Sequence, residues 1–307
     1  MDPITTINPK KDSTLAMIRA AVKKGWKIFY MEQKHLFISN GKAYAIQSEL
    51  TLCEGENIWY HLAEEEAVPL SNLHVIMMRK DPPFDNEYIY STYILELAEK
   101  AGSLVINKPQ SLRDANEKLF TTWFPQCTPE TLVTRSSALF REFLNKHQDI
   151  ILKPLDGMGG ASIFRVKHDD PNISVIIETL TDHGQQLAMA QRFIPEITEG
   201  DKRILLINGI PVPFALARIP AKGETRGNLA AGGTGVSVPL SEKDYWIVDQ
   251  VAPTLVAKGL IFVGLDVIGD RLTEINVTSP TCIQELDKAN GLDIATQLMN
   301  CIEEKIQ

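Results

Sequence analysis

Short apolar runs and amphipathic helical stretches alternate along the chain from its start to about Asp149. The run "HVIMM" (74–78) is continuous and apolar, as is typical of a strand buried in a parallel sheet. Another strand-like run, "KIFYM" (27–31), leads to Asn40-Gly41, a residue pair favoured in two-residue hairpin turns. The alternation of strands and helices predicts parallel α/β units in this half of the protein.

Two helices predicted in this half begin at recognisable capping residues. The first follows Asp12 or Ser13, and either side chain can cap it. A later helix is expected over 111–123, where Ser111 and Asp114 have the spacing of a capping box.

From about Leu132 the pattern changes to pairs of strand-like runs joined by short turns. Three such pairs flank the glycine-rich loop "LDGMGG" (155–160), Asn208-Gly209 and Gly269-Asp270. Antiparallel pairs interspersed with helices predict an α+β second half. The segment "IPAKGETRGNLAAGGTGVSVP" (219–239) is too long and too rich in glycine for a simple connection, so we expect a functional loop there.

The third of these strand pairs carries acids and an amide where core residues are expected. Side chains alternate faces along a strand, so Glu274 and Asn276 share one face. A bare two-residue turn at Gly269-Asp270 would place Asp266 opposite Thr273, whereas a bulge or a three-residue loop would place it opposite Glu274. In the second register two carboxylates and an amide oxygen converge, a set that suits Mg²⁺. The alternative is a solvated strand face with incidental polar residues.

The glycine-rich loop is a candidate phosphate-binding element. Lys153 ends the strand before it, and Gly157, Gly159 and Gly160 allow the loop backbone to wrap closely around phosphates. The loop lacks the Gly-Lys-Ser/Thr of a P-loop and the third glycine of the dinucleotide-binding fingerprint. A simple turn is therefore the alternative interpretation.

Composition narrows the classes of partner. The 307 residues carry a formal net charge of −8, and Lys and Arg are nowhere clustered, which argues against nucleic acid or an anionic membrane surface. Arg203 and Arg218 lie within apolar strands, where an unpaired charge is costly, so each is expected to face an anion. The four cysteines are far apart, and we find no apolar signal segment, which predicts free thiols in a cytoplasmic protein.

Several motifs together resemble the bacterial glutathione synthetases, a family of ATP-grasp ligases. Those similar to ATP-grasp ligases in general are Lys153-Pro154 with the glycine loop, "AQRFIPE" (190–196), Asp266 and "EINVTSP" (274–280). Those similar to the bacterial glutathione synthetases in particular are "MRKDPPFD" (78–85), "NKPQSLRDANEKLF" (107–120) and "RGNLAAGG" (226–233). The resemblance covers nearly the whole chain, and the joint occurrence of the motifs is highly specific.

The resemblance implies an ATP-grasp fold with an N-terminal parallel-sheet (pre-ATP-grasp) domain. The substrate domain would span 1–115, the lid subdomain 116–195, and the metal-binding and catalytic subdomain 196–307. Members of this family carry a short apolar strand before "MDPI", where this sequence begins. Either the start is truncated or another strand takes that place.

The resemblance also implies the reaction, which is ATP-dependent joining of γ-glutamylcysteine to glycine. An acyl phosphate would form on the way, and glutathione, ADP and phosphate would be released. ATP would lie between two sheet layers, and Asp266, Glu274 and Asn276 would hold two Mg²⁺ ions, with Mn²⁺ as a substitute. The partners would be these small molecules and other copies of the chain in a homotetramer.

Further residue roles follow from the same resemblance. Nucleotide binding would fall to Lys118, Lys153, Gly157, Gly159, Gly160, Gln191, Phe193, Ile194 and Asp201. Which of Glu196, Glu199 and Asp201 holds the ribose stays open. The catalytic residues would be Arg203 and Arg218, the substrate-binding residues Arg226 and Arg79. The loop 219–239 would close over the acyl phosphate and exclude water.

Three other functions share parts of this pattern. D-alanine ligases share the fold but have an Arg-x-Asp pattern at the first metal carboxylate. In this sequence Gly264, not an arginine, stands two residues before Asp266. Ligases that add glutamate to a protein C-terminus share the E-x-N-x-S-P ending but lack "MRKDPPFD". A synapsin-like protein would bind nucleotide without catalysis, but the three metal ligands and both phosphate lysines are present.

Overall fold

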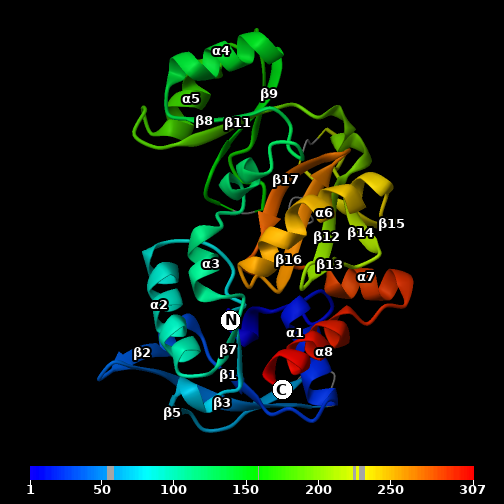
Figure 1. The fold of residues 1–307 in the computed structure, drawn as a ribbon. Coiled ribbons are helices and arrows are strands. Elements are labelled where there is room, and N and C mark those ends of the chain that lie inside the picture. Colours follow the sequence, from blue (N-terminus) through cyan, green and yellow to red (C-terminus); the bar gives the residue numbers. More distant parts are fainter. Residues whose placement is uncertain (54–58, 158, 224–225, 228–231) are drawn as a thin grey trace.

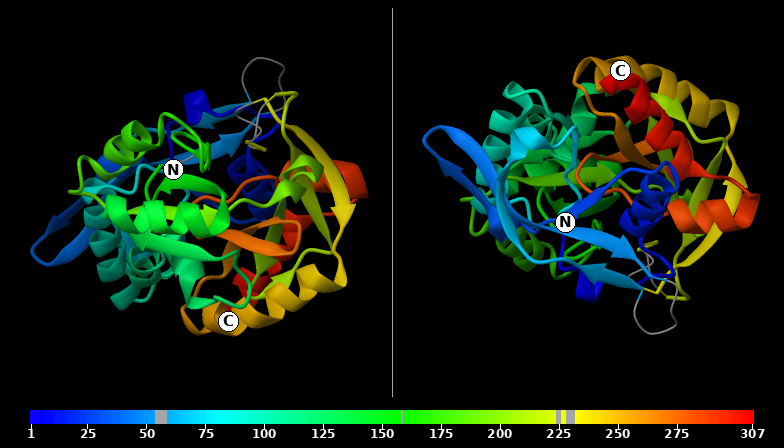
Figure 2. Two further views of the ribbon diagram at one scale, coloured as in Figure 1. Left: turned by 90° about the horizontal axis from the view of Figure 1, so that it is seen from above. Right: turned by 90° about the horizontal axis from the view of Figure 1, so that it is seen from below.

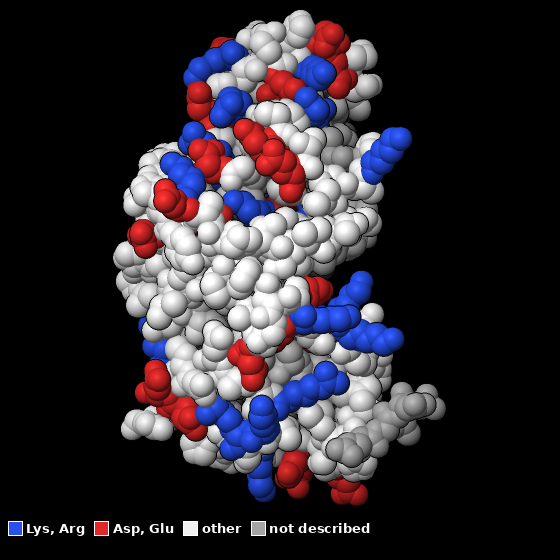
Figure 3. Space-filling model, turned by 90° about the vertical axis from the view of Figure 1, so that its right-hand side faces the viewer, with Lys and Arg blue, Asp and Glu red and all other residues white. Residues whose placement is uncertain are grey.

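The computed structural model describes residues 1–53, 59–157, 159–223, 226–227 and 232–307 of the chain. Three parts lie one above another in Figure 1: an N-terminal part at the bottom, a C-terminal part in the middle and a small upper lobe formed by residues 131–192. None of the helices among the described residues is long and apolar enough to cross a membrane. On the face shown in Figure 3, basic and acidic side chains are interspersed.

The N-terminal part combines an antiparallel sheet, a parallel strand pair and three helices. Its elements are α1 (Ser13–Lys23), β1 (Ile28–Tyr30), β2 (Leu36–Ser39), β3 (Lys42–Leu52), β4 (Tyr60–Leu62), β5 (Glu66–Pro69), β6 (Val75–Met77), α2 (Asn86–Lys100), β7 (Leu104–Ile106) and α3 (Pro109–Asp114). β6 and β7 pair in parallel, which confirms the arrangement predicted for "HVIMM".

Most strands of this part are not in the parallel array that the sequence pattern predicted. β1 to β5 form an antiparallel sheet around the long strand β3. The turn at Asn40-Gly41 has positive φ at both residues and reverses the chain directly from β2 into β3. Parallel strands need a long crossover, so strands joined by such short turns pair antiparallel.

The predicted helix starts had different outcomes. Asp12 caps α1, because its side chain accepts a hydrogen bond from the backbone N–H of Leu15. The helix predicted over 111–123 is instead two short helices, α3 and a 3₁₀ helix at Leu119–Trp123. Ser111 caps neither: it lies inside α3, which starts earlier because a proline occupies its first position, and its hydroxyl donates to the carbonyl of Lys258.

The upper lobe is a four-stranded antiparallel sheet packed against two helices. Its elements are β8 (Thr131–Thr134), α4 (Ser137–His147), β9 (Asp149–Pro154), β10 (Phe164–Lys167), α5 (Ile173–Thr181) and β11 (Ala188–Arg192), with the strands in the order β10-β9-β11-β8. The hairpin β9–β10 around the glycine loop is the one predicted from the sequence. The lobe has a hydrophobic core of its own, formed by side chains from both helices and the sheet.

The C-terminal part is built on a larger antiparallel sheet in the order β15-β14-β12-β16-β17. Its elements are β12 (Asp201–Ile207), β13 (Ile210–Pro211), β14 (Phe214–Ile219), β15 (Thr234–Pro239), α6 (Glu242–Ala257), β16 (Phe262–Ile268), β17 (Arg271–Asn276), α7 (Ile283–Asn290) and α8 (Ile294–Ile306). Figure 2 shows α8 beside α1, and Met17, Met299 and Ile302 share one buried cluster there.

The segment 219–239 is only partly the loop that its composition predicted. Its last six residues form β15, which pairs along its whole length with β14. Val236 and Val238 alternate with small or polar residues there, as is typical of a strand, and the abundance of glycine just before them obscured this pattern. Residues 224–225 and 228–231 of the proposed lid lie outside the described residues.

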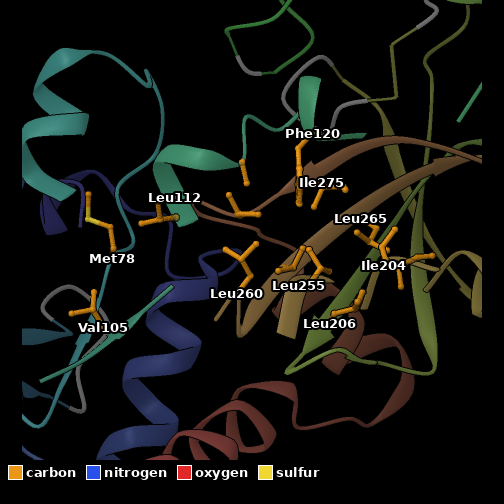
Figure 4. Close-up of a cluster of buried hydrophobic side chains, with 14 of the residues drawn as sticks. Met78, Val105, Leu112, Phe120, Ile204, Leu206, Leu255, Leu260, Leu265 and Ile275 are labelled. Carbon is orange, nitrogen blue, oxygen red and sulfur yellow. The ribbon is translucent and has the colours of Figure 1, made fainter. Parts of the chain in front are cut away.

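A buried core joins the N-terminal part to the C-terminal sheet. Met78 belongs to the same cluster as Leu265 of β16 and Ile275 of β17, all of them labelled in Figure 4. Since side chains alternate along a strand, Asp266 and Glu274 point to the opposite face of the sheet from Leu265 and Ile275. The polar face of β16 and β17 is therefore backed by a packed apolar layer.

Candidate nucleotide and metal site

A cavity of about 280 Å³ lies between the upper lobe and the C-terminal sheet. One wall comes from β9, the glycine loop and β11, and the other from β12, β14, β16 and β17. Every residue given a definite site role from the sequence lines this cavity, except Arg79, while Glu196 and Glu199, the alternatives to Asp201 for the ribose, do not line it. The fold thus brings together side chains that are up to about half the chain apart in sequence.

The hairpin β16–β17 has the register that places the two carboxylates together. Asp266 lies opposite Glu274 and Gly264 lies opposite Asn276, while Val267 already pairs with Leu272. Thr273 is the extra residue of a bulge, and its hydroxyl donates to the carbonyl oxygen of Asp266 at 3.1 Å. The predicted bulge is confirmed, and Asp266, Glu274 and Asn276 share the cavity face.

The anion that Arg203 and Arg218 face is a carboxylate of the protein itself. Arg203 holds Asp266 through two hydrogen bonds of 2.5 and 3.0 Å, and Arg218 lies 2.9 Å from the same carboxylate. Gly264 leaves room for this arrangement, because a Cβ there would lie 2.9 Å from Cδ of Arg203. Arg218 also pairs with Asp201. The buried Arg203, Arg218 and Asp266 and the half-buried Asp201 therefore form one network in the cavity wall.

Burial and these charges act on the two aspartates in opposite directions. Burial by itself would raise the pKa of Asp266, but Arg203 and Arg218 hold the pKa of that carboxyl well below its usual range. Burial raises the pKa of Asp201 to about 7, since Arg218 only partly offsets it and the negative charges of Asp266 and Glu274 add to it. Asp266 is thus fixed as the anion of the network.

Two buried lysines, Lys118 and Lys153, line the cavity. Lys118 pairs with Glu117, donates to the carbonyl oxygen of Gly157 at 2.9 Å and lies 3.8 Å from Glu274. Burial opposes its charge, but Glu274 and Glu117 outweigh burial and raise the pKa of Lys118. Lys153 is buried, and burial lowers its pKa; its ammonium lies 3.4 Å from the carbonyl oxygen of Thr273.

The glycine loop and β11 form the wall of the cavity that belongs to the upper lobe. Gly157, Gly159 and Gly160 all have positive φ, a conformation that favours glycine. Beyond them the wall is formed by Gln191, Phe193 and Ile194, and the ring of Phe193 has the guanidinium of Arg165 stacked 3.6 Å from its centre. This part of the wall therefore offers a flat, largely apolar surface.

Arg79 lies away from this cavity. Its guanidinium donates to the hydroxyl of Thr14 and to the carbonyl of Pro280, and it borders a separate cavity of about 470 Å³ between α1, β1, β6 and α8. That second cavity is larger but mainly apolar in its lining residues, and it holds none of the clustered carboxylates and lysines. Arg226 does line the charged cavity, with a contact to the carbonyl oxygen of Gly160 at 3.4 Å.

The donor set on β16 and β17 fits a divalent cation that also takes oxygens from a ligand. The amide nitrogen of Asn276 lies 3.4 Å from the carbonyl oxygen of Gly264, which leaves its own carbonyl oxygen as an acceptor. Among the described residues, no three acidic, histidine or cysteine side chains are placed to share one metal ion. The protein would therefore supply part of the coordination shell, as is usual for Mg²⁺.

Sequence reasoning gave no role to some residues that line the cavity. Glu117 is the clearest case: its carboxylate lies beside Lys118, and burial raises its pKa to about 7, with the charge of Glu274 adding to the effect. The sequence feature that could have pointed to Glu117 is its position directly before Lys118, which was predicted to bind phosphate. Thr281 and the buried Cys282 follow the "EINVTSP" motif directly and also line the cavity.

Comparison with known proteins gives matches over the whole chain. The family models for the prokaryotic glutathione synthetase N-terminal domain and ATP-grasp domain match residues 1–113 and 117–291. Curated glutathione synthetases of Vibrio vulnificus and Shewanella oneidensis are each 62% identical, over 100% of this chain and 96% and 97% of their own lengths. That of Pseudomonas aeruginosa is 62% identical over 98% of this chain and 95% of its own length.

Solved structures with much lower identity share the fold. The ATP-grasp ligase PsnB, complexed with a minimal precursor, superposes with a TM-score of 0.64 at 18% identity, over 96% of each chain. The macrocyclase MdnC of Microcystis aeruginosa gives 0.62 at 13% identity, over 98% of this chain and 97% of the other. Together with the family matches, these findings show that the chain is an ATP-dependent ligase of the ATP-grasp fold and belongs to the prokaryotic glutathione synthetase family.

Proposed function

We propose that the chain forms glutathione by joining the cysteinyl carboxylate of γ-glutamylcysteine to the amine of glycine, with ATP cleaved to ADP and phosphate. The observation that supports this most directly is the shared cavity: two buried arginines, two lysines, a glycine loop and a facing pair of carboxylates converge there. Family membership at about 60% identity over the full length points to the same reaction.

ATP would lie in the cavity with its phosphates toward Lys118, Lys153 and the glycine loop. The flat surface of Phe193 and Ile194, together with Gln191 at the end of β11, suits an adenine base. Asp201 has one carboxylate oxygen, Oδ1, that is buried without a hydrogen-bond partner within the described structure. That oxygen is available to a ribose hydroxyl, which favours Asp201 over Glu196 and Glu199 for this role.

The chemistry requires cationic groups because two anions must meet. The substrate carboxylate attacks the γ-phosphate of ATP, and the bond from that phosphorus to the bridging oxygen of ADP breaks. Arg203 and Arg218, held by Asp266, are placed to stabilise the charge on the transferring phosphoryl group. The glycine amine then attacks the acyl phosphate, and the same arginines would stabilise the oxyanion before phosphate leaves.

We further propose that Asp266, Glu274 and Asn276 hold Mg²⁺, or Mn²⁺ in its place, as two ions when ATP is bound. The ions would neutralise the β- and γ-phosphates. Asp266 contributes less freely than Glu274, because both of its oxygens already accept from arginine. Arg226 at the cavity edge is our candidate for a substrate carboxylate. Arg79 remains a candidate only through its contact with the carbonyl of Pro280, which follows "EINVTS".

ADP release is expected only when γ-glutamylcysteine, glycine and Mg²⁺ are present together. The acyl phosphate needs the first substrate to form and the second to be consumed, so omission of either should reduce turnover to background. A coupled assay of ADP, with each component left out in turn, measures this. Equal ADP release without γ-glutamylcysteine would point to a different acceptor or an idle ATPase, and the proposed reaction would be wrong.

Assembly and location are proposals of the same kind. We propose a homotetramer, on the family resemblance, and light scattering coupled to size exclusion measures the mass of the assembly against the chain mass of 34.2 kDa. All four cysteines are free. Free thiols are usual in a reducing compartment, which supports our proposal of a cytoplasmic enzyme.

A further inference from the structure

Glu117 is a carboxylate of the cavity that has no part in the proposed reaction. Its side chain is 19% exposed and forms an ion pair with Lys118. The negative charge of Glu274 repels that of Glu117. A largely buried acid beside another acid is unfavourable unless a cation compensates it. The structure supplies that cation as Lys118.

Lys118 has two acidic neighbours and pairs with one of them. Its ammonium contacts Glu117 and the carbonyl oxygen of Gly157, and it stops 3.8 Å from the nearer oxygen of Glu274. A gap of that size is just beyond hydrogen-bond distance, so a small rotation of the lysine side chain would complete a contact with Glu274. Glu117 and Glu274 thus compete for the same ammonium.

The backbone keeps both acids in place for this competition. The carbonyl oxygen of Glu117 accepts from the backbone N–H of Ile275 at 2.8 Å, which fixes Glu117 to β17 next to Glu274. The side chain of Asn116 accepts from the backbone N–H of Lys118 and donates to the carbonyl of Leu155 in the glycine loop. The segment 116–118 is therefore tied to both walls of the cavity, and the Lys118 ammonium has both carboxylates within reach.

We propose that Glu117 is a positioning residue that holds Lys118 away from Glu274 and so leaves the oxygens of Glu274 available to a divalent cation. Without the charge of Glu117, Glu274 becomes the nearest carboxylate to the ammonium, and the lysine competes with the metal for it. The inference rests on the proposed metal role of Glu274. It assigns Glu117 no contact with the metal or with the substrates.

The test is the affinity for Mn²⁺ alone, titrated by water-proton relaxation without nucleotide, so that the phosphate contacts of Lys118 do not enter. Glu117→Gln keeps the shape of the side chain and removes its charge, and it should weaken Mn²⁺ binding about 10-fold, the size usual for residues that support a metal ligand. Thermal melting of each variant checks that the fold is retained. Unchanged Mn²⁺ affinity in Glu117→Gln would overturn the inference.

A second variant separates positioning from direct ligation. In a Lys118→Met background there is no ammonium to hold, so adding Glu117→Gln should change the Mn²⁺ affinity by less than about 2-fold, a strong departure from additivity. An equal loss in both backgrounds would mean that Glu117 acts on the metal directly, and the positioning role would be wrong. If Glu274→Gln binds Mn²⁺ as tightly as the unsubstituted protein, the metal role of Glu274 itself is wrong, an outcome distinct from failure at Glu117 alone.

Discussion

Replacing Glu274 with Gln is expected to lower kcat about 10²–10³-fold, the usual cost of losing one contact that stabilises the transition state. The substitution keeps the size of the side chain but removes a negative charge from the polar face of β17, opposite Asp266. Cations held by few protein oxygens depend on each of them, and the phosphates lose their alignment when a cation is lost. Folding should be unaffected or improved, because one of several clustered acids becomes neutral.

Steady-state turnover at limiting Mg²⁺ and thermal melting together measure both halves of this expectation. Thr273→Ser is a matched control on the same strand, since it keeps the hydroxyl that closes the bulge through the carbonyl of Asp266. Near-normal turnover of Glu274→Gln at limiting Mg²⁺ would remove Glu274 from the metal site and return β17 to the interpretation of a solvated strand.

Asp266→Asn is expected to abolish activity as well, but with a large loss of stability. Asp266 is 2% exposed and is the counter-ion of Arg203 and Arg218. Removing one partner of a buried ion pair typically costs about 3–5 kcal/mol, because the remaining charge is left buried and uncompensated. Two acids of the same proposed metal site should thus respond oppositely in stability: Glu274→Gln neutral or stabilising, Asp266→Asn strongly destabilising.

Urea unfolding of both variants tests this contrast, and its pH dependence adds a second check. The arginines lower the pKa of Asp266 below its ordinary value of about 3.9, so its contribution to stability is fully present above that pH and is lost only as the pH falls through the lowered pKa. Asp201, whose pKa burial and the charge of Asp266 raise to about 7, costs less to ionise in Asp266→Asn, so the stability gap between wild type and this variant should narrow as the pH rises from about 5 to about 7. Equal unfolding free energies would show that the arginine network does not stabilise the fold.

The sequence was most informative where a turn determines the local geometry. The pairs Asn40-Gly41, Asn208-Gly209 and Gly269-Asp270 each reverse the chain where predicted. Both residues of the first two pairs and Gly269 of the third have the positive φ that closes such a hairpin. The alternation of side chains then predicted which residues of β17 share a face. The turn alone did not predict the bulge at Thr273. It was predicted because only the register with a bulge or longer loop brings the carboxylates of Asp266 and Glu274 to the same face.

Interactions between distant segments could not be read from the sequence. Arg203 and Arg218 were expected to face an anion, but Asp266 as that anion depends on β16 pairing with β12, which no local pattern specifies. Likewise the single helix predicted over 111–123 does not form, because residues 116–118 in its middle make hydrogen bonds with Ile275 and Leu155 instead. Tertiary contacts override local helical preference there.

The separate core of the upper lobe has a consequence for cooperativity. The N-terminal part and the C-terminal sheet share buried clusters, whereas the buried cluster of the lobe contains lobe residues only. Such a unit can open locally at a lower free energy than the whole protein. A nucleotide that touches both walls of the cavity would link the lobe to the rest, so amide hydrogen exchange in α4 and α5 should slow when ADP and Mg²⁺ are added, although neither helix lines the cavity. Exchange unchanged in these helices would mean that α4 and α5 exchange through openings that nucleotide binding does not oppose.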